Sequence, residues 1–163
     1  MFRVGLAIAF VVAVLDQLTK WWVLAELMDP PRTIPVTGFF TLVLAWNRGV
    51  SFSLFSGQLS PYVFSAIAGL IVVGLSIWLW RAENRWLAGA IGLIIGGAVG
   101  NIVDRLRFGA VADFLYFHVG EFYWPAFNLA DSAITIGVAI LIFDSLFGQR
   151  RQQDESELDG REG

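Results

Sequence analysis

Two aspartates stand beside the ends of apolar segments in an otherwise hydrophobic chain. Asp113 follows one long apolar run, and Asp131 opens the next. A carboxylate costs about 2.5–3.5 kcal/mol at the centre of a membrane helix, so ionisable groups at membrane depth usually have partners and a function. Two carboxyl groups held close together share one proton, because like charges a few ångströms apart resist ionising together. The two residue types therefore predict acid–base hydrolysis of a peptide bond by a membrane-embedded aspartyl protease.

The composition is that of a membrane protein. Of the 163 residues, 56% are hydrophobic and 15% are charged, and the mean hydropathy is +0.66, whereas a soluble domain carries about 25% charge. Seven Trp and fourteen Phe are many for this length, and aromatic residues gather at membrane interfaces. The chain has no cysteine, which excludes a disulfide framework, a thiol nucleophile and a thiolate metal site.

Four apolar stretches are each long enough to cross a bilayer about 30 Å thick, which takes about 20 helical residues. They cover residues 4–27, 61–80, 86–103 and 129–147. A short basic turn at 81–85 joins the second stretch to the third, which predicts an antiparallel helical hairpin, and the glycines of the third stretch permit close helix packing. We expect one integral-membrane domain over residues 1–147 and a polar, disordered cytoplasmic tail over 148–163.

The arginines predict the orientation of these helices. Those concentrated in short segments on one side are Arg3, Arg81, Arg85, Arg150 and Arg151. The positive-inside rule then places both termini in the cytoplasm and residues 28–60 and 105–128 outside. Both outer loops are rich in β-branched and aromatic residues, so we expect a small sheet on the outer membrane surface, with a hairpin turn at 118–121.

Two polar clusters lie in the first half of the chain, and each has a structural interpretation beside a functional one. Asp16 and Lys20 have the i,i+4 spacing of a pair that neutralises itself, although for Asp16 we expect a role in bracing the site. Asn47 and Gly49 suit a turn at a strand end. Alternatively, Asn47 donates hydrogen bonds to a bound substrate or to a catalytic carboxylate.

Two further clusters lie at the helix ends next to the aspartates. Asn101, Asp104 and Arg105 end the third apolar stretch. A helix C-terminus favours a cation, which accounts for Arg105, and Asp104 fits a structural role as well as a functional one. Asn128 and Asp131 match an N-cap followed by an acid at the third helical position, which is a capping box. Only the combination of Asp131 with the earlier aspartate favours catalysis.

Other catalytic arrangements fit the sequence less well. The single histidine, His118, falls in a predicted turn, and no dense metal-ligand spacing is present, so we expect neither a metal nor another cofactor. A Ser–Lys dyad is the nearest enzymatic alternative, because burial lowers the pKa of a lysine and Lys20 is the only one. Its nucleophile would be Ser51, Ser53 or Ser56. A small ion-coupled carrier with a polar path and a purely structural scaffold are the alternatives outside the enzymes.

Taken together, the clusters resemble the lipoprotein signal peptidases (signal peptidase II), in that family's order and spacing. The matching segments are Asp16–Lys20, Asn47–Gly49 with Phe52–Ser53, Gly96–Arg105, Gly109–Val111 with Asp113–Phe114, and Phe127–Asp131. One segment alone is weak evidence, but five in register, covering nearly the whole chain to about Phe147, are specific. Two departures are minor: Arg48 and Val50–Ser51 stand where the family often has smaller residues, and Ala112 stands where Val is common.

The resemblance implies a bacterial inner-membrane enzyme with four transmembrane helices and an outward-facing β-cradle. Such an enzyme removes the signal peptide from diacylglyceryl-modified prolipoproteins, cuts before the lipidated cysteine and is a target of the cyclic peptide globomycin. The resemblance further implies that Asp113 and Asp131 are the catalytic pair. The residues expected to bind substrate or support the pair are Asp16, Lys20, Asn47, Gly49, Asn101, Asp104, Arg105, Asn128 and Ala130. We expect a monomer whose partners are the prolipoprotein and membrane lipid, with no nucleic acid.

Overall fold

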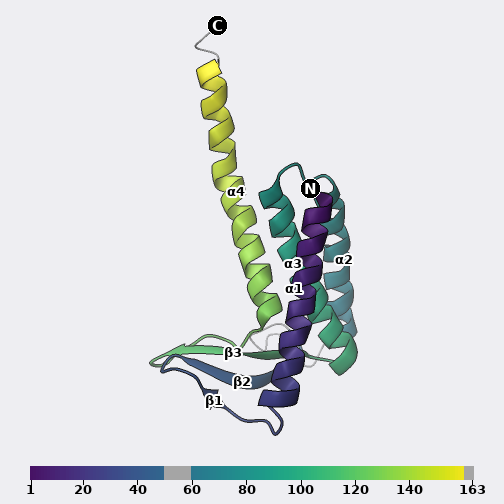
Figure 1. Ribbon diagram of the computed structural model, residues 1–163, viewed down its shortest axis with the longest axis vertical. Helices are drawn as coiled ribbons and strands as arrows, with labels where there is room; N and C mark the ends of the chain where they lie inside the picture. The colour runs from purple at the N-terminus through teal and green to yellow at the C-terminus, as the bar shows by residue number, and fades with distance from the viewer. Residues whose placement is uncertain (50–59, 160–163) are drawn as a thin grey trace.

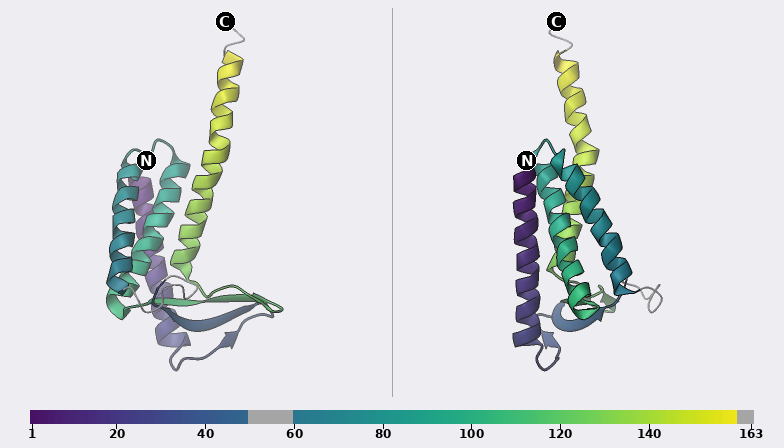
Figure 2. Two further views of the ribbon diagram at one scale, coloured as in Figure 1. Left: turned by 180° about the vertical axis from the view of Figure 1, so that it is seen from behind. Right: turned by 90° about the vertical axis from the view of Figure 1, so that its right-hand side faces the viewer.

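The computed structural model describes residues 1–49 and 60–159. Within these residues, long helices stand side by side and a small sheet lies across one end of the bundle (Figure 1). The N-terminus, the short turn after residue 80 and the far end of the last helix lie at the opposite end (Figures 1 and 2). The bundle end that carries the sheet is the end at which both aspartates of interest lie.

The predicted apolar spans are helices in the structure. They are α1 (Phe2–Trp22) with a π-helical continuation (Val23–Leu27), α2 (Pro61–Trp80), α3 (Arg85–Phe108) and α4 (Leu129–Asp159). All four are long and apolar enough to cross a membrane, which confirms the fold class. Ordinary capping sets the ends of α3, since the Asn84 side chain accepts a hydrogen bond from the Leu87 amide (2.7 Å) and Gly109 ends the helix at φ 70°.

The last helix is longer than its apolar part. The sequence predicts disorder from residue 148, whereas α4 remains helical as far as Asp159. Residues 149–159 contain neither Gly nor Pro and are rich in Gln, Arg and Glu, all of which have high helix propensity. A helix that is already nucleated extends into such a segment without a new nucleation cost, and hydropathy alone does not register this.

Close packing around α3 holds the bundle together. This helix contacts α1, α2 and α4, and its glycines allow backbones to meet directly. A Cβ at Gly92 would overlap the Gly5 carbonyl of α1, and a Cβ at Gly97 would overlap the Ala130 carbonyl of α4. The predicted role of the small residues is therefore confirmed for these contacts.

The sheet brings the two loops together as an antiparallel layer. Its order is β1 (Ile34–Pro35), β2 (Phe40–Asn47), β3 (Val111–Val119) and β4 (Phe122–Tyr123). The turn between β3 and β4 contains Gly120 at φ 58°, inside the predicted turn at 118–121. The pairing of β2 with β3 sets Ala45 opposite Asp113 and Asn47 opposite Val111. The sheet thereby carries the end of β2 to the first aspartate.

Candidate active site

The two aspartates lie where the sheet meets the helix ends, and Asn128 connects them. Asp113 is on β3 and is 2% exposed, while Asp131 is in the first turn of α4. The Asn128 side chain donates a hydrogen bond from Nδ2 to Asp113 Oδ1 (2.7 Å). Its backbone N–H donates to Asp131 Oδ2 (3.2 Å). One fully buried asparagine therefore contacts both carboxyl groups.

The Asp113 carboxyl is held in a site that favours its protonated form. Burial, and after it the negative charge of Asp131, raise the pKa of Asp113 to about 6. Hydrogen bonds from Asn47 Nδ2 (3.1 Å to Oδ2) and from Asn128 act against this rise in pKa. The result is a carboxyl group that exchanges its proton close to neutral pH.

This pKa has a consequence for stability. The folded protein keeps the proton of Asp113 up to about pH 6, whereas an unfolded chain loses it near pH 4. Between these values the folded state binds more protons, so the free energy of unfolding falls as the pH rises from about 4 to about 6. Unfolding measured across this range in detergent should show a shallower slope for Asp113→Asn. An unchanged slope would contradict the raised pKa.

Asp131 takes part in a capping box with Asn128 and also accepts a hydrogen bond from the side-chain amide of Asn101. Its backbone N–H donates to Asn128 Oδ1 (3.0 Å), while its own Oδ2 accepts from the Asn128 N–H, so the predicted capping interaction is confirmed. Its other oxygen, Oδ1, accepts a hydrogen bond from Asn101 Nδ2 (2.8 Å). Capping therefore uses one carboxylate oxygen and leaves the other beside Asn101, so the two interpretations are compatible.

A buried charge cluster lies behind the two aspartates. The Lys20 ammonium is within 2.9 Å of Asp16 Oδ2 and 2.8 Å of Asp104 Oδ2, and it donates to Asn101 Oδ1 (3.0 Å). An ammonium has three hydrogens, and each has an acceptor here. The i,i+4 pair of Asp16 and Lys20 is present, but it belongs to a larger cluster in which Lys20 is 2% exposed.

The two acids of this cluster each hold the residue before one of the site aspartates. Asp16 Oδ1 accepts from the backbone N–H of Ala130 (2.9 Å), and Asp104 Oδ2 accepts from that of Ala112 (3.1 Å). The cluster therefore fixes the start of α4 and the start of β3 relative to each other. This accounts for the expected supporting positions Asp16, Asp104 and Ala130.

Two residues outside the predicted set complete the cluster. Gln17 donates to Asp104 Oδ1 (2.9 Å) and to the Gly100 carbonyl (3.2 Å), and a Cβ at Gly100 would overlap the Asp16 carboxylate. Sequence spacing does not indicate either role, because these contacts run between α1 and α3. The two partners of Gln17 lie 83 and 87 residues away in the chain.

The remaining expected residues surround the same point. Asn47 Oδ1 accepts from the Gly49 N–H (3.1 Å), so Asn47 forms a turn and also donates to Asp113. Arg105 donates to the Asn101 carbonyl (3.5 Å) and lies 6.0 Å from the Phe64 ring centroid. Its Nε is buried without a hydrogen-bond partner among the described residues.

Lys20 and His118, the rival catalytic groups that the structure describes, have partners other than a serine nucleophile. The three hydrogens of Lys20 are taken up by acceptors, as described above, and the candidate nucleophiles Ser51, Ser53 and Ser56 fall outside the described residues. His118 lies 3.2 Å from the Thr41 hydroxyl on the sheet. In the described part of the chain, no group of three or more His, Cys, Asp or Glu could hold a metal ion.

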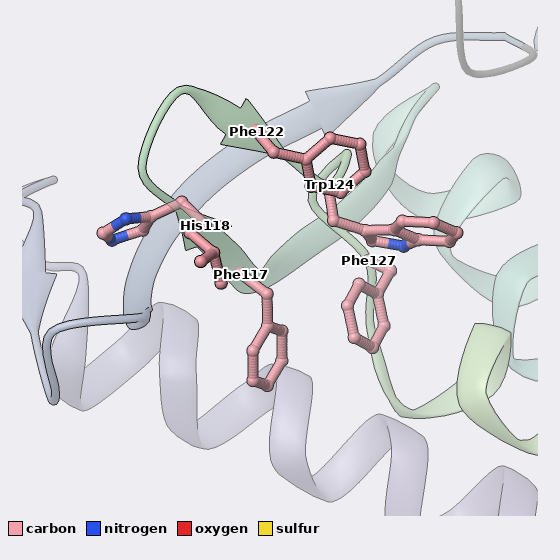
Figure 3. A pocket seen from close by; sticks show the side chains of 6 residues that line it. Phe117, His118, Phe122, Trp124 and Phe127 are labelled. Carbon is pink, nitrogen blue, oxygen red and sulfur yellow. The ribbon is translucent and has the colours of Figure 1, made fainter.

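An apolar pocket of about 340 Å³ lies further along the sheet from the carboxyl pair. It is lined by Phe117, His118, Val119, Phe122, Trp124 and Phe127. The Phe117 and Phe127 rings stack with centroids 5.9 Å apart and point to the same side of the sheet (Figure 3). Alternate residues of a strand share a face, so Phe117 lies on the face of β3 that also carries Asp113.

Comparisons with known proteins identify the family of the chain. Residues 8–147 match the family model for signal peptidase (SPase) II. The lipoprotein signal peptidase of Azoarcus sp. (strain BH72) is 53% identical over 146 residues, covering 86% of this chain and 81% of that protein. The one from Beijerinckia indica is 48% identical over 144 residues, covering 86% of both chains.

Two solved structures, each described as a bacterial membrane enzyme, share the fold. Both have a TM-score of 0.75, with sequence identities of 31% and 30%. The first covers 87% of both chains, and the second covers 88% of this chain and 92% of the other. The chain therefore belongs to the signal peptidase II family, the lipoprotein signal peptidases, and is a membrane protease.

Proposed function

We propose that this membrane protease is an aspartic endopeptidase in which Asp113 and Asp131 are the catalytic pair. Its family removes signal peptides from prolipoproteins, and we propose that it cuts before a diacylglyceryl-modified cysteine. The observation that carries the proposal is that Asn128 holds both carboxyl groups, one of which has a pKa of about 6. The carrier and scaffold alternatives do not account for membership of a protease family.

The pair supplies the proton transfers of peptide hydrolysis in two steps. In the addition step, one carboxylate takes a proton from the attacking water while the other carboxyl group, protonated, donates to the oxygen of the scissile carbonyl, which gives a tetrahedral diol. When the C–N bond breaks, the first carboxyl group gives the proton it took from water to the leaving amine, and the second takes a proton back from the diol. Either carboxyl group can fill either role in this mechanism. The amides of Asn47, Asn101 and Asn128 orient the carboxyl groups by donating to their oxygens.

Other groups around the pair suit a substrate that is part peptide and part lipid. The buried Nε of Arg105 is a donor available to a peptide carbonyl, and Asn47 lies next to Asp113 at the end of β2. The apolar pocket beside Phe117 and Phe127 offers hydrocarbon contacts further along the sheet. A globomycin-type cyclic peptide is expected to compete for the same region.

We place the enzyme in the bacterial inner membrane, as a monomer with both termini in the cytoplasm. The support is the concentration of arginines at the end of the bundle that carries the N-terminus and the α2–α3 turn. The carboxyl pair and the sheet lie at the other end, so the site would face outward.

The substrate class is tested by offering the same precursor with and without its lipid. Purified protein in detergent micelles should cleave the diacylglyceryl-modified prolipoprotein and leave the unmodified precursor intact, since the lipid brings substrate to the membrane-level site. Mass spectrometry of the products gives the position of the cut. Equal cleavage of both precursors, or a cut away from the cysteine, would contradict the proposed specificity.

A further inference from the structure

A groove lies at the end of the bundle away from the sheet, between α1, α3 and α4. Its volume is about 420 Å³, which is within the range of about 300–1,000 Å³ found for small-ligand pockets. Residues that line it include Ile8 on α1, Ile140 on α4, and Arg85, Trp86, Gly89 and Leu93 on α3. Towards this end α4 leans away from α1 and α3 (Figures 1 and 2).

The shape of the groove suits a hydrocarbon chain. Gly89 leaves its floor open, because a Cβ there would meet only the Ile8 side chain, at an ordinary 3.6 Å. The aliphatic side chains of Ile8, Leu93 and Ile140 are half-buried around it. On the flank of membrane-spanning helices, an apolar groove is surrounded by lipid, so an acyl chain fills it at no cost in lost hydrogen bonds.

The mouth of the groove is cationic. Arg85 is exposed. Among the described residues, the ion pairs all involve Lys20, so the Arg85 guanidinium has no carboxylate partner among them. It is also the first residue of α3, where the helix dipole favours an anion. Trp86 beside it is 76% exposed, as is common at the level of lipid headgroups. Basic pockets of this kind between membrane helices bind anionic lipid headgroups.

We propose that this groove binds one anionic phospholipid from the leaflet that borders the α2–α3 turn. Its phosphate pairs with Arg85, and one acyl chain lies over Gly89 between Ile8 and Ile140. The site is at the opposite end of the bundle from the carboxyl pair, and the proposal does not depend on the peptidase chemistry. A second copy of this chain is the competing occupant, and the experiment distinguishes the two.

The test measures lipids retained by the purified full-length protein in detergent micelles. Phosphatidylglycerol and phosphatidylcholine with identical acyl chains are titrated separately, and bound lipid is counted by native mass spectrometry. The wild type should keep one phosphatidylglycerol in preference to phosphatidylcholine. Arg85→Gln should weaken phosphatidylglycerol binding about fivefold and leave phosphatidylcholine binding unchanged. Gly89→Leu should weaken both, because the new side chain occupies the groove.

Two matched variants serve as controls. Arg3→Gln removes the same charge from the same end of the bundle without lining the groove. Gly74→Leu adds the same side chain on α2, where a Cβ would meet nothing within 4 Å. Both should bind lipid as the wild type does. If Gly89→Leu fails to fold, Arg85→Gln still tests the proposal. The Arg85 side chain is exposed, so this variant should fold.

Three results would overturn the proposal. Equal retention of the two lipids by the wild type would remove the anionic preference. A loss in Arg3→Gln as large as that in Arg85→Gln would indicate a diffuse basic surface. A dimer that is present in the wild type and absent in Gly89→Leu would assign the groove to a second copy of the chain.

Discussion

Replacing Asp113 with Asn should abolish cleavage while leaving the protein folded. The amide cannot act as a general acid or base, and general acid–base catalysis is worth about 10²–10⁴-fold, so we expect kcat to fall by about that factor. The fold should persist because burial already disfavours the ionised form of this group, and Asn presents a neutral side chain of nearly the same shape. The measurement is the cleavage rate beside thermal unfolding of the same preparation.

The control is Asp29→Asn, the same change at an exposed position near the sheet end of the bundle. It should cleave at the wild-type rate. If Asp113→Asn retained turnover, or if it lost activity only by unfolding, Asp113 would not be a catalytic residue.

Replacing Lys20 with Met should lower the free energy of unfolding more than the other single substitutions would. Lys20→Met leaves the buried carboxylates of Asp16 and Asp104 facing each other without a counter-charge. Removing one partner of a buried ion pair costs about 3–5 kcal/mol. The free energy of unfolding measured in micelles should therefore fall by that amount. A triple variant that also carries Asp16→Asn and Asp104→Asn should recover much of the loss, because no unpaired charge remains.

Arg3→Met is the matched control for this change. It removes a long cationic side chain from an exposed position on the same helix, and surface substitutions of this kind usually change stability by less than about 0.5 kcal/mol. Wild-type stability of Lys20→Met would show that the cluster does not hold the site together. Cleavage by folded Lys20→Met at low temperature would exclude the Ser–Lys alternative.

The sequence predicted those structural features that depend on residues close together in the chain. The capping box of Asn128 and Asp131 follows from a four-residue pattern, and the end of α3 followed by β3 brings Asp113 towards the helix ends. The glycines of α3 predicted close helix approach, and the contacts at Gly92 and Gly97 bear this out. Each of these inferences needed only a few consecutive residues or one helical period.

Side-chain contacts between different helices could not be predicted from the sequence. Lys20 looked like half of a local pair, but its shortest ion pair is with Asp104 on α3. That contact depends on the register of α1 against α3, which is set by backbone contacts such as Gly5 against Gly92. The role of Gln17 was missed for the same reason. Hydropathy alone does not register the helix propensity of residues 149–159, over which α4 continues to Asp159.

The most direct test of the proposed mechanism compares cleavage of the diacylglyceryl-modified prolipoprotein by wild type, Asp113→Asn and Asp131→Asn in the same micelles. Product mass spectrometry follows both the rate and the position of the cut. The catalytic pair predicts a single cut before the modified cysteine by the wild type and none by either folded variant. Cleavage at that position by either variant would contradict the assignment and place the catalytic groups elsewhere in the chain.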